Sequence, residues 1–154
     1  MKTPVLYLLP CIFLLTACFN TDDEAEYDNS SDIAYLEDNA TREGVTVTES
    51  GLQYRVLEEG DGERPVSGSQ VRVHYTGTFI DDNVFDSSHH REEPLDFTVG
   101  QGVISGFSEG ALLMREGAVY EIVLPAELAY GDSPPPGMYP GATLIFVVEL
   151  LEIL

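Results

Sequence analysis

The segment VISGFSEGALLM, residues 103–114, is the part of this chain that decides its fold. Its apolar residues fall three or four positions apart, which predicts an amphipathic helix. These residues are Ile104, Phe107, Ala111 and Met114, with Leu112 beside them. The segments on both sides follow a two-residue period instead, so the chain places one helix within a strand-rich region.

Strands are predicted before and after this helix. Residues 52–56 and 71–75 alternate apolar and polar side chains, which is typical of strands with one buried face. Residues 119–124 and 143–151 are longer apolar runs rich in β-branched residues, and the second is expected at the centre of a sheet. Turn-forming residues separate these runs. The predicted fold class is therefore α+β, with an antiparallel sheet wrapped over this amphipathic helix.

The N-terminal residues have the pattern of an export signal. A positive charge at Lys2 precedes an apolar run over residues 5–15, which is too short to cross a bilayer of ~30 Å. The run ends in Leu15-Thr16-Ala17-Cys18, which resembles a bacterial lipoprotein signal. We therefore expect a signal peptide over residues 1–17 and lipidation of Cys18. The alternative is an ordinary secretory signal that happens to contain a cysteine.

This signal has consequences for location and for thiol chemistry. A lipid on Cys18 would anchor the protein in the cell envelope, and Phe19 favours the outer membrane, facing the periplasm or the surface, by analogy with enteric bacteria. The other cysteine, Cys11, would leave with the signal peptide. The mature domain would then hold no thiol, which excludes a disulfide, a thiol nucleophile and a cysteine-ligated metal.

Residues 18–44 are expected to form an acidic tether between the anchor and the folded domain at residues 45–154. The acidic residues of positions 19–32 have no positive charge among them, so the run is expected to stay solvated and extended. A calcium site is disfavoured because the spacing does not match a calcium-binding loop. Ile33, Leu36 and Ala40 predict at most a short helix that ends before Gly44.

Composition limits the class of protein further. A chain of 154 residues supports one ordinary domain, and 44% hydrophobic residues can form a core. The 27 acidic residues outnumber the 7 basic ones, so the formal net charge is −20. This acidic protein is a poor partner for nucleic acid, because a phosphate backbone requires clustered Lys and Arg. The charge also disfavours adsorption to an anionic lipid surface.

General motif rules do not identify a catalytic centre. The sequence contains no nucleophile elbow, phosphate-binding loop or His-Glu-x-x-His motif. His74 lies on a predicted strand, and His89 and His90 are neighbours that would point to opposite sides of an extended segment. We therefore expect neither a metal nor another cofactor. Pattern and composition alone support an exported, acidic α+β domain.

Five short strings that stand in order along the chain are more specific. They are Val73-His74-Tyr75-Thr76-Gly77, Phe85-Asp86-Ser87-Ser88, Val103-Ile104-Ser105-Gly106-Phe107, Leu128-Ala129-Tyr130-Gly131 and the run ATLIFVVEL at residues 142–150. Together they resemble FKBP-type peptidyl-prolyl cis-trans isomerases over residues 48–152. The segment TESGLQYRV at residues 48–56 is similar to the first strand of exported bacterial members. The resemblance implies the FKBP-like fold, a twisted antiparallel β-sheet wrapped around one short α-helix, which agrees with the α+β prediction from periodicity.

The resemblance also implies a set of site residues. Catalytic roles fall to Asp86, Tyr130, Phe107 and Tyr75, and substrate-binding roles fall to Phe85, Arg91, Leu95, Val103, Ile104, Tyr139 and Phe146. Each aromatic residue taken singly would be explained by ordinary core packing. Their occurrence as a set in the order of the family favours a pocket.

The resemblance gives these residues distinct tasks. Phe107 would be the floor under a proline ring, and the Ile104 N–H and the Tyr130 hydroxyl would meet substrate carbonyl groups. Asp86 would lie beside the twisted amide, and Arg91 would hold both Tyr75 and Asp86 in place. Tyr139 would line the rim. No bond is made or broken in the reaction, so the absence of a nucleophile fits this activity.

Departures from the family pattern are expected to affect the binding of inhibitors more than the isomerase activity. Phe107 stands where many members have Trp, Leu95 stands where several have an aromatic residue, and residues 132–137 are unusually rich in proline. We expect a shallower pocket, weak binding of macrolide inhibitors and a stiff loop. The chain also lacks the long dimerisation region of some exported members, so a monomer is expected.

Two functions fit these residues best. The first is an isomerase that accelerates X-Pro isomerisation in unfolded or folding polypeptides after export. The second is a chaperone or binding module that uses the same pocket with little turnover. A purely structural role in the cell envelope is disfavoured, because it would give an aromatic pocket no purpose.

Overall fold

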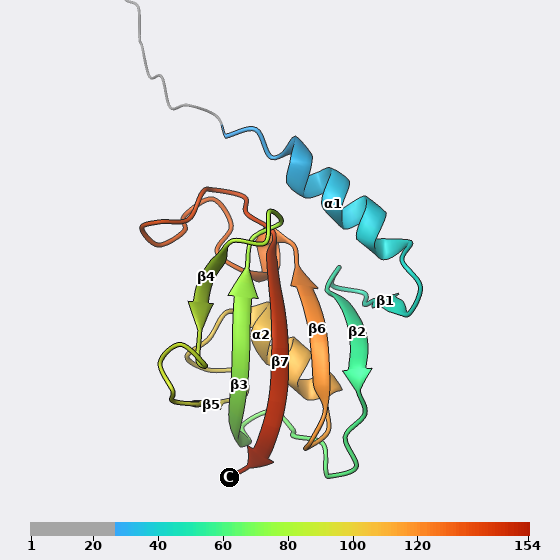
Figure 1. The fold of residues 1–154 in the computed structure, drawn as a ribbon, viewed down its shortest axis with the longest axis vertical. Coiled ribbons are helices and arrows are strands. Elements are labelled where there is room, and N and C mark those ends of the chain that lie inside the picture. The colour runs from blue at the N-terminus through green and yellow to red at the C-terminus, as the bar shows by residue number, and fades with distance from the viewer. Residues whose placement is uncertain (1–26) are drawn as a thin grey trace, which may run out of the picture.

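The computed structural model describes residues 27–154, which fold into one antiparallel sheet with a helix packed against it (Figure 1). The predictions for residues 1–26, including the signal peptide at 1–17 and lipidation of Cys18, lie outside the described residues. The α+β fold predicted from periodicity is confirmed. Within residues 27–154, no helix has the length and apolar character needed to cross a membrane.

The sheet has seven strands in the order β1-β2-β6-β7-β3-β4, and β5 pairs with β3. The strands are β1 Val45–Val47, β2 Gln53–Glu58, β3 Gln70–Thr78, β4 Val84–Ser87, β5 Leu95–Thr98, β6 Val119–Leu124 and β7 Leu144–Ile153. The helices are α1 Ser30–Ala40 and α2 Ser105–Leu113, with a 3-10 turn, η1, at Ala126–Leu128. As predicted, β7 is central, because it pairs with β6 on one side and β3 on the other.

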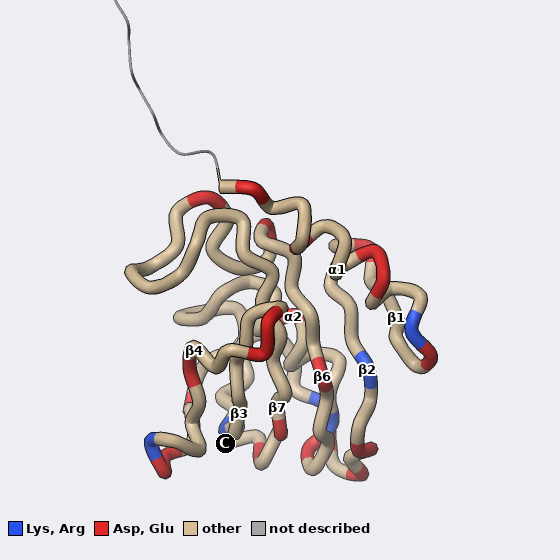
Figure 2. The backbone as a smooth tube through the Cα atoms, turned by 45° about the horizontal axis from the view of Figure 1, so that its top comes forward, with Lys and Arg blue, Asp and Glu red and all other residues tan. Residues whose placement is uncertain are grey.

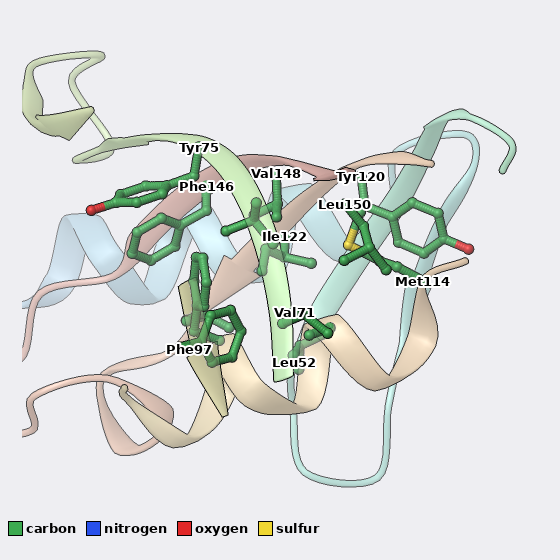
Figure 3. Packing of buried hydrophobic residues seen from close by; sticks show 14 of the residues in the cluster. Leu52, Val71, Tyr75, Phe97, Met114, Tyr120, Ile122, Phe146, Val148 and Leu150 are labelled. Atoms are coloured by element: carbon green, nitrogen blue, oxygen red, sulfur yellow. The ribbon is translucent and has the colours of Figure 1, made fainter. Parts of the chain in front are cut away.

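Helix α2 lies against one face of the sheet and closes the core (Figure 1). Its predicted apolar stripe is confirmed, since Phe107, Ala111 and the following Met114 are buried. Leu112, which adjoins that stripe in sequence, is 37% exposed. Close approach of the helix requires a glycine at position 106, where a Cβ would lie 2.6 Å from a methyl carbon of Leu124 on β6. Figure 3 shows the packed core between the helix and the sheet.

Helix α1 lies outside the sheet, beside β1 (Figure 1). The prediction of a short helix is confirmed, and of the three apolar residues that indicated it, Leu36 and Ala40 are half-buried while Ile33 is 57% exposed. The buried residues of α1 are the polar Asp32 and Asn39. The Asn39 amide donates to the Gln53 side chain of β2 at 2.8 Å, and Gln53 donates to the Leu36 carbonyl at 2.9 Å. Polar contacts to the domain therefore fix this helix.

Burial of Asp32 also corrects the expectation that residues 19–32 stay solvated. The Asp32 side chain is 3% exposed, although the run around it in the sequence is acidic. A carboxylate is buried at low cost only when hydrogen-bond donors replace its water. Here its Oδ1 accepts the buried backbone N–H of Thr143 at 2.7 Å. The donor comes from the opposite end of the chain, so the local charge pattern does not predict this burial.

Acidic residues are spread over the helices, strands and loops, with few basic residues between them (Figure 2). The Arg72 guanidinium joins two of them, Asp96 at 2.7 Å and Glu152 at 2.6 Å. In residues 27–154, no group of three or more His, Cys, Asp or Glu side chains is arranged to hold a metal ion. Apart from the buried Asp32, the acidic side chains of residues 27–154 lie wholly or partly at the surface.

A core leucine tests the packing of α2 on the sheet. Leu124 is fully buried against Gly106, whereas Leu57, also on a strand, is 45% exposed. We expect Leu124→Ala to lower the free energy of unfolding by about 2–5 kcal/mol, because truncation leaves a cavity in a closely packed core. Leu57→Ala is the matched control and should cost less than about 1 kcal/mol. Urea denaturation followed by circular dichroism measures both, and equal losses would contradict this packing.

Candidate active site

A cavity opens at one end of the core, where β3, β4, β7 and the start of α2 meet. Its volume is about 230 Å³. The lining residues are Tyr75, Phe85, Asp86, Leu95, Gly102, Val103, Ile104, Phe107, Tyr130 and Phe146. Nine of these ten were assigned to the site from the sequence, and Gly102 was not. Residues from six separate segments of the sequence therefore surround one apolar space.

Aromatic rings form the base and walls of this cavity. Phe107 is 4% exposed, and its ring meets Tyr75 edge-on, with centroids 5.5 Å apart, and Phe146 at 5.2 Å. Phe85 stands perpendicular to Phe146 at 5.6 Å. Figure 3 shows Tyr75 and Phe146 side by side at the end of the core. These edge-to-face contacts hold the rings rigidly, so the cavity is preformed.

Gly77 on β3 makes room for two of the rings. A Cβ at this position would lie 2.6 Å from Phe85 Cζ and 2.9 Å from Phe146 Cε1. No side chain fits there, so glycine is required for the close approach of both walls. Gly77 belongs to one of the five family-like strings but was not predicted to have a role of its own. A glycine inside a strand pattern was the available signal, since it marks a site of close packing.

A polar network borders the apolar cavity. The Tyr75 hydroxyl donates to Asp86 Oδ2, and the Arg91 guanidinium donates to Asp86 Oδ1 and to the Tyr75 hydroxyl, the latter at 2.9 Å. Ser88, two residues after Asp86, links this segment to β3, because the Ser88 Oγ accepts a hydrogen bond from the Tyr75 N–H at 2.8 Å. The expectation that Arg91 contacts both Tyr75 and Asp86 agrees with this geometry. Arg91 itself lies outside the cavity lining.

The network sets the charge state of Asp86. Burial alone would raise the pKa of the Asp86 carboxyl, but the hydrogen bonds from Tyr75 and Arg91 outweigh burial and hold the pKa below its ordinary value. Burial raises the pKa of the Tyr75 hydroxyl, and its hydrogen bond to Asp86 raises it further. At neutral pH the cavity is therefore bordered by an ionised carboxylate and a neutral phenol. Asp86 is the one charged residue in the lining.

Two residues at the ends of short elements complete the cavity. Ile104 is the N-cap of α2, and its carbonyl accepts the Phe107 N–H at 3.1 Å, which fixes the start of the helix. Tyr130 follows η1 and is 40% exposed. Both side chains face the cavity. Ile104 and Tyr130 thus border the cavity from two separate loops.

Tyr139 lies outside the candidate site, although it was predicted to be part of it. The residue was expected at the rim, but it is not among the cavity-lining residues. Its hydroxyl donates to Asp32 Oδ1 at 3.2 Å, and its ring stacks on Tyr27 with centroids 4.4 Å apart. The ring also packs on Phe79 at 5.4 Å. These contacts place the ring against the N-terminal segment and Phe79, outside the cavity lining.

The histidines form a pair on the outside of the sheet. The rings of His74 and His89 are stacked with centroids 4.5 Å apart, and His74 Nδ1 is 2.9 Å from Ser88 Oγ. His89 and His90 are exposed, as expected for a surface segment. None of the three lines the cavity.

Comparison with known proteins identifies the family. Residues 61–151 match the family model described as FKBP-type peptidyl-prolyl cis-trans isomerase. Residues 18–56 match the model of the domain amino terminal to such isomerases, which overlaps the predicted tether. This chain belongs to the FKBP-type peptidyl-prolyl cis-trans isomerase family. The resemblance stated from the five strings is thereby confirmed.

Individual relatives support the same assignment. The chain is 52% identical, over 79% of its length, to the FKBP-type 22 kDa peptidyl-prolyl cis-trans isomerase of Escherichia coli strain K12. It is 40% identical, over 84% of its length, to the outer membrane protein MIP of Legionella longbeachae. It spans 59% and 56% of the length of these two relatives.

Solved structures confirm the FKBP-like fold. The crystal structure of FkpA from Escherichia coli matches with a TM-score of 0.78 and 42% identity, over 81% of this chain and 58% of that one. The crystal structure of AtFKBP13 matches with a TM-score of 0.68 and 32% identity, over 71% of this chain and 98% of that one. The architecture predicted from the sequence therefore corresponds to that of the family.

The polar network can be tested by titration. We expect Arg91→Gln and Tyr75→Phe each to raise the pKa of Asp86, because each removes a donor to its carboxylate. In the wild type the folded pKa lies below the unfolded value of about 3.9, so ionised Asp86 stabilises the fold above that value. This stabilisation is lost as the pH falls through the folded pKa. Carbon-13 NMR of the carboxyl group measures the titration, and an unchanged pKa in both variants would refute the network.

Proposed function

We propose that this protein is a peptidyl-prolyl cis-trans isomerase that acts on X-Pro bonds. The observation that carries the proposal is the preformed aromatic cavity with Phe107 at its base and Asp86 and Tyr130 at its border. A cavity of about 230 Å³ suits the small proline ring. The membership of the chain in the isomerase family and its 52% identity to a named isomerase support the proposal.

The reaction requires only that the protein bind a twisted amide better than a planar one. An X-Pro amide isomerises slowly because its C–N bond has partial double-bond character, with a barrier near ~20 kcal/mol. Twisting removes this resonance and reduces the charge separation across the amide. An apolar cavity that replaces water therefore favours the twisted state over both planar isomers.

Each site residue has a role in this mechanism. The proline ring would lie on Phe107, between the walls formed by Tyr75, Phe85 and Phe146. The backbone N–H of Ile104 and the Tyr130 hydroxyl would donate hydrogen bonds to substrate carbonyl groups on either side of the bond. These contacts would orient the substrate, which lowers the entropic cost of reaching the transition state.

Asp86 would act through electrostatics rather than proton transfer. Its low pKa keeps it ionised at neutral pH, and the bonds from Tyr75 and Arg91 fix its direction. A fixed carboxylate beside the twisted amide would interact with the partial charges that the twist redistributes. Because Arg91 neutralises much of its charge, Asp86 can border an apolar cavity without a large penalty.

The substrates would be polypeptides that are still unfolded or folding. A proline reaches a cavity of this kind only when the chain around it is accessible. Leu95 and Val103 add apolar surface to the lining, which favours an apolar residue before the proline. The monomeric state and the weak binding of macrolide inhibitors stay predictions from the family resemblance.

A protease-coupled assay on a short Leu-Pro peptide tests the activity. We expect the wild type to accelerate isomerisation and Tyr130→Phe to lower kcat/KM about three- to tenfold, the effect of about one hydrogen bond in the transition state. Phe107→Leu should lower it further, because the aromatic floor is lost. Tyr54→Phe is the matched control, since Tyr54 stacks on Tyr120 away from the cavity lining and should keep full activity.

The same variants separate the isomerase from a binding module. The isomerase and its pocket would be refuted by two results together. The wild type would not accelerate isomerisation, and Phe107→Leu and Asp86→Ala would bind an unfolded client as well as the wild type does. Acceleration lost in Tyr130→Phe but not in Tyr54→Phe would support the site as described. Equal losses in both tyrosine variants would place the site elsewhere.

We further propose that the protein is exported and held in the cell envelope by a lipid on Cys18. The proposal is supported by the sequence Leu15-Thr16-Ala17-Cys18. In cells fed labelled palmitate, the wild type should carry label and sediment with membranes, and Cys18→Ser should lose both. Cys11→Ser changes the other cysteine of the predicted signal and should keep the label. An unlabelled wild type, or label on Cys18→Ser, would refute the anchor.

A further inference from the structure

The start of helix α1 holds the long loop that precedes β7. Asp32 Oδ1 accepts two hydrogen bonds from that region, from the Thr143 N–H at 2.7 Å and from the Tyr139 hydroxyl at 3.2 Å. Asp32 and Thr143 are 3% and 1% exposed. Burial raises the pKa of the Tyr139 hydroxyl, and the neighbouring Asp32 carboxylate raises it further. This contact thus joins buried polar groups that depend on each other for hydrogen bonds.

Two further residues strengthen the contact. Tyr27 stacks on Tyr139 with centroids 4.4 Å apart. The amide of Asn29 fills the space in front of Gly141, where a Cβ would lie 1.9 Å from Asn29 Nδ2. Gly141 also has a positive φ of 73°, which favours glycine. Residues 27–32 therefore contact the loop at three points.

The loop connects this contact to the cavity by two routes. At its base the Gly141 N–H donates to the Gly131 carbonyl at 2.9 Å, and Tyr130, which lines the cavity, is the residue before Gly131. On the other side, Tyr139 packs on Phe79 at 5.4 Å, and Phe79 packs at 5.0 Å on Phe85, another lining residue. A shift of the loop base would thus reach the cavity from two directions.

We infer that Asp32 is a positioning residue of the candidate active site. It holds residues 131–143 so that Tyr130 and Phe85 keep their places around the cavity. The inference rests on the proposed isomerase function, and it makes the segment that precedes the sheet part of the catalytic apparatus. The hydrogen-bond partners of Asp32, Tyr139 and Thr143, are not lining residues of the cavity, so its effect passes through the loop.

The other end of α1 provides a matched comparison. Asn39 is 2% exposed and also forms a buried hydrogen bond, but its partner is Gln53 on β2. Strand β2 contributes no residue to the cavity lining. If α1 acts only as a brace for the fold, loss of either contact should have the same effect. If Asp32 positions the loop, only its loss should change catalysis.

The experiment compares Asp32→Ala, Asp32→Asn and Asn39→Ala, each in the full chain and at a temperature where the variant is folded. We expect Asp32→Ala to lower kcat/KM for the Leu-Pro peptide about fivefold, chiefly through a higher KM. The reason is that the loop and Tyr130 would no longer be held in the orientation that binds the peptide. Asp32→Asn keeps an oxygen acceptor and should stay within about twofold of the wild type. Asn39→Ala should lower the melting temperature and leave kcat/KM unchanged.

A second measurement does not depend on activity. In the free protein, Asp32→Ala should shift the amide NMR signals of Tyr130 and Gly131, whereas Asn39→Ala should leave them in place. Unshifted signals in a folded Asp32→Ala protein, or an unchanged kcat/KM with an active wild type, would overturn the inference. Equal kinetic losses in Asp32→Ala and Asn39→Ala would also overturn it, since they would show a general brace.

The two proposals fail in different ways. A wild type that neither isomerises nor binds the peptide would refute the isomerase, and the NMR signals would still decide whether Asp32 holds the loop. A wild type that binds without turnover would refute the isomerase alone. In that case the affinity for the peptide is measured in place of kcat/KM. Asp32→Ala should then bind the peptide more weakly than the wild type, and Asp32→Asn and Asn39→Ala should bind it about as well.

Discussion

The packing of the Phe107 ring beneath the sheet is the contact on which the rest of this structure depends. Helix α2 brings the ring under Tyr75 and Phe146, and each meets it at a steep angle. The ring closes one end of the core and at the same time forms the base of the cavity. Because the same aromatic contacts stabilise the fold and shape the site, the cavity needs no ligand to hold it open.

The polar groups of the site lie at the border of this apolar cavity. A protein with a net charge of −20 keeps one acidic side chain, Asp86, in the cavity lining and pairs it with Arg91. Most other carboxylates of residues 27–154 lie at the surface, where water solvates them at little cost, and the buried Asp32 accepts hydrogen bonds from Thr143 and Tyr139 instead. This separation allows a strongly acidic protein to offer an apolar site to an uncharged proline ring.

Periodicity and short motifs were enough to predict most of the fold and much of the site. The two-residue period of β3 and the helical spacing of Phe107, Ala111 and Met114 reflect which side chains must leave water, and this depends only on local geometry. The central place of β7 followed from its long apolar run. The strings around Tyr75, Asp86 and Tyr130 predicted which side chains meet at the cavity, because the family resemblance supplies the long-range contacts that a single sequence lacks.

Local patterns in the sequence thus predict the strands and the core helix, and the family resemblance adds the aromatic residues of the cavity. The positions of Asp32, Asn39 and Tyr139 depend on long-range contacts that form when the chain folds. Asp32 belongs to an acidic run that local rules place in water, yet its partners are 107 and 111 positions away. A polar side chain can be buried wherever donors replace its lost water, and local sequence does not show such distant donors. For this reason the link between the N-terminal helix and the loop beside the cavity emerges only from the folded chain.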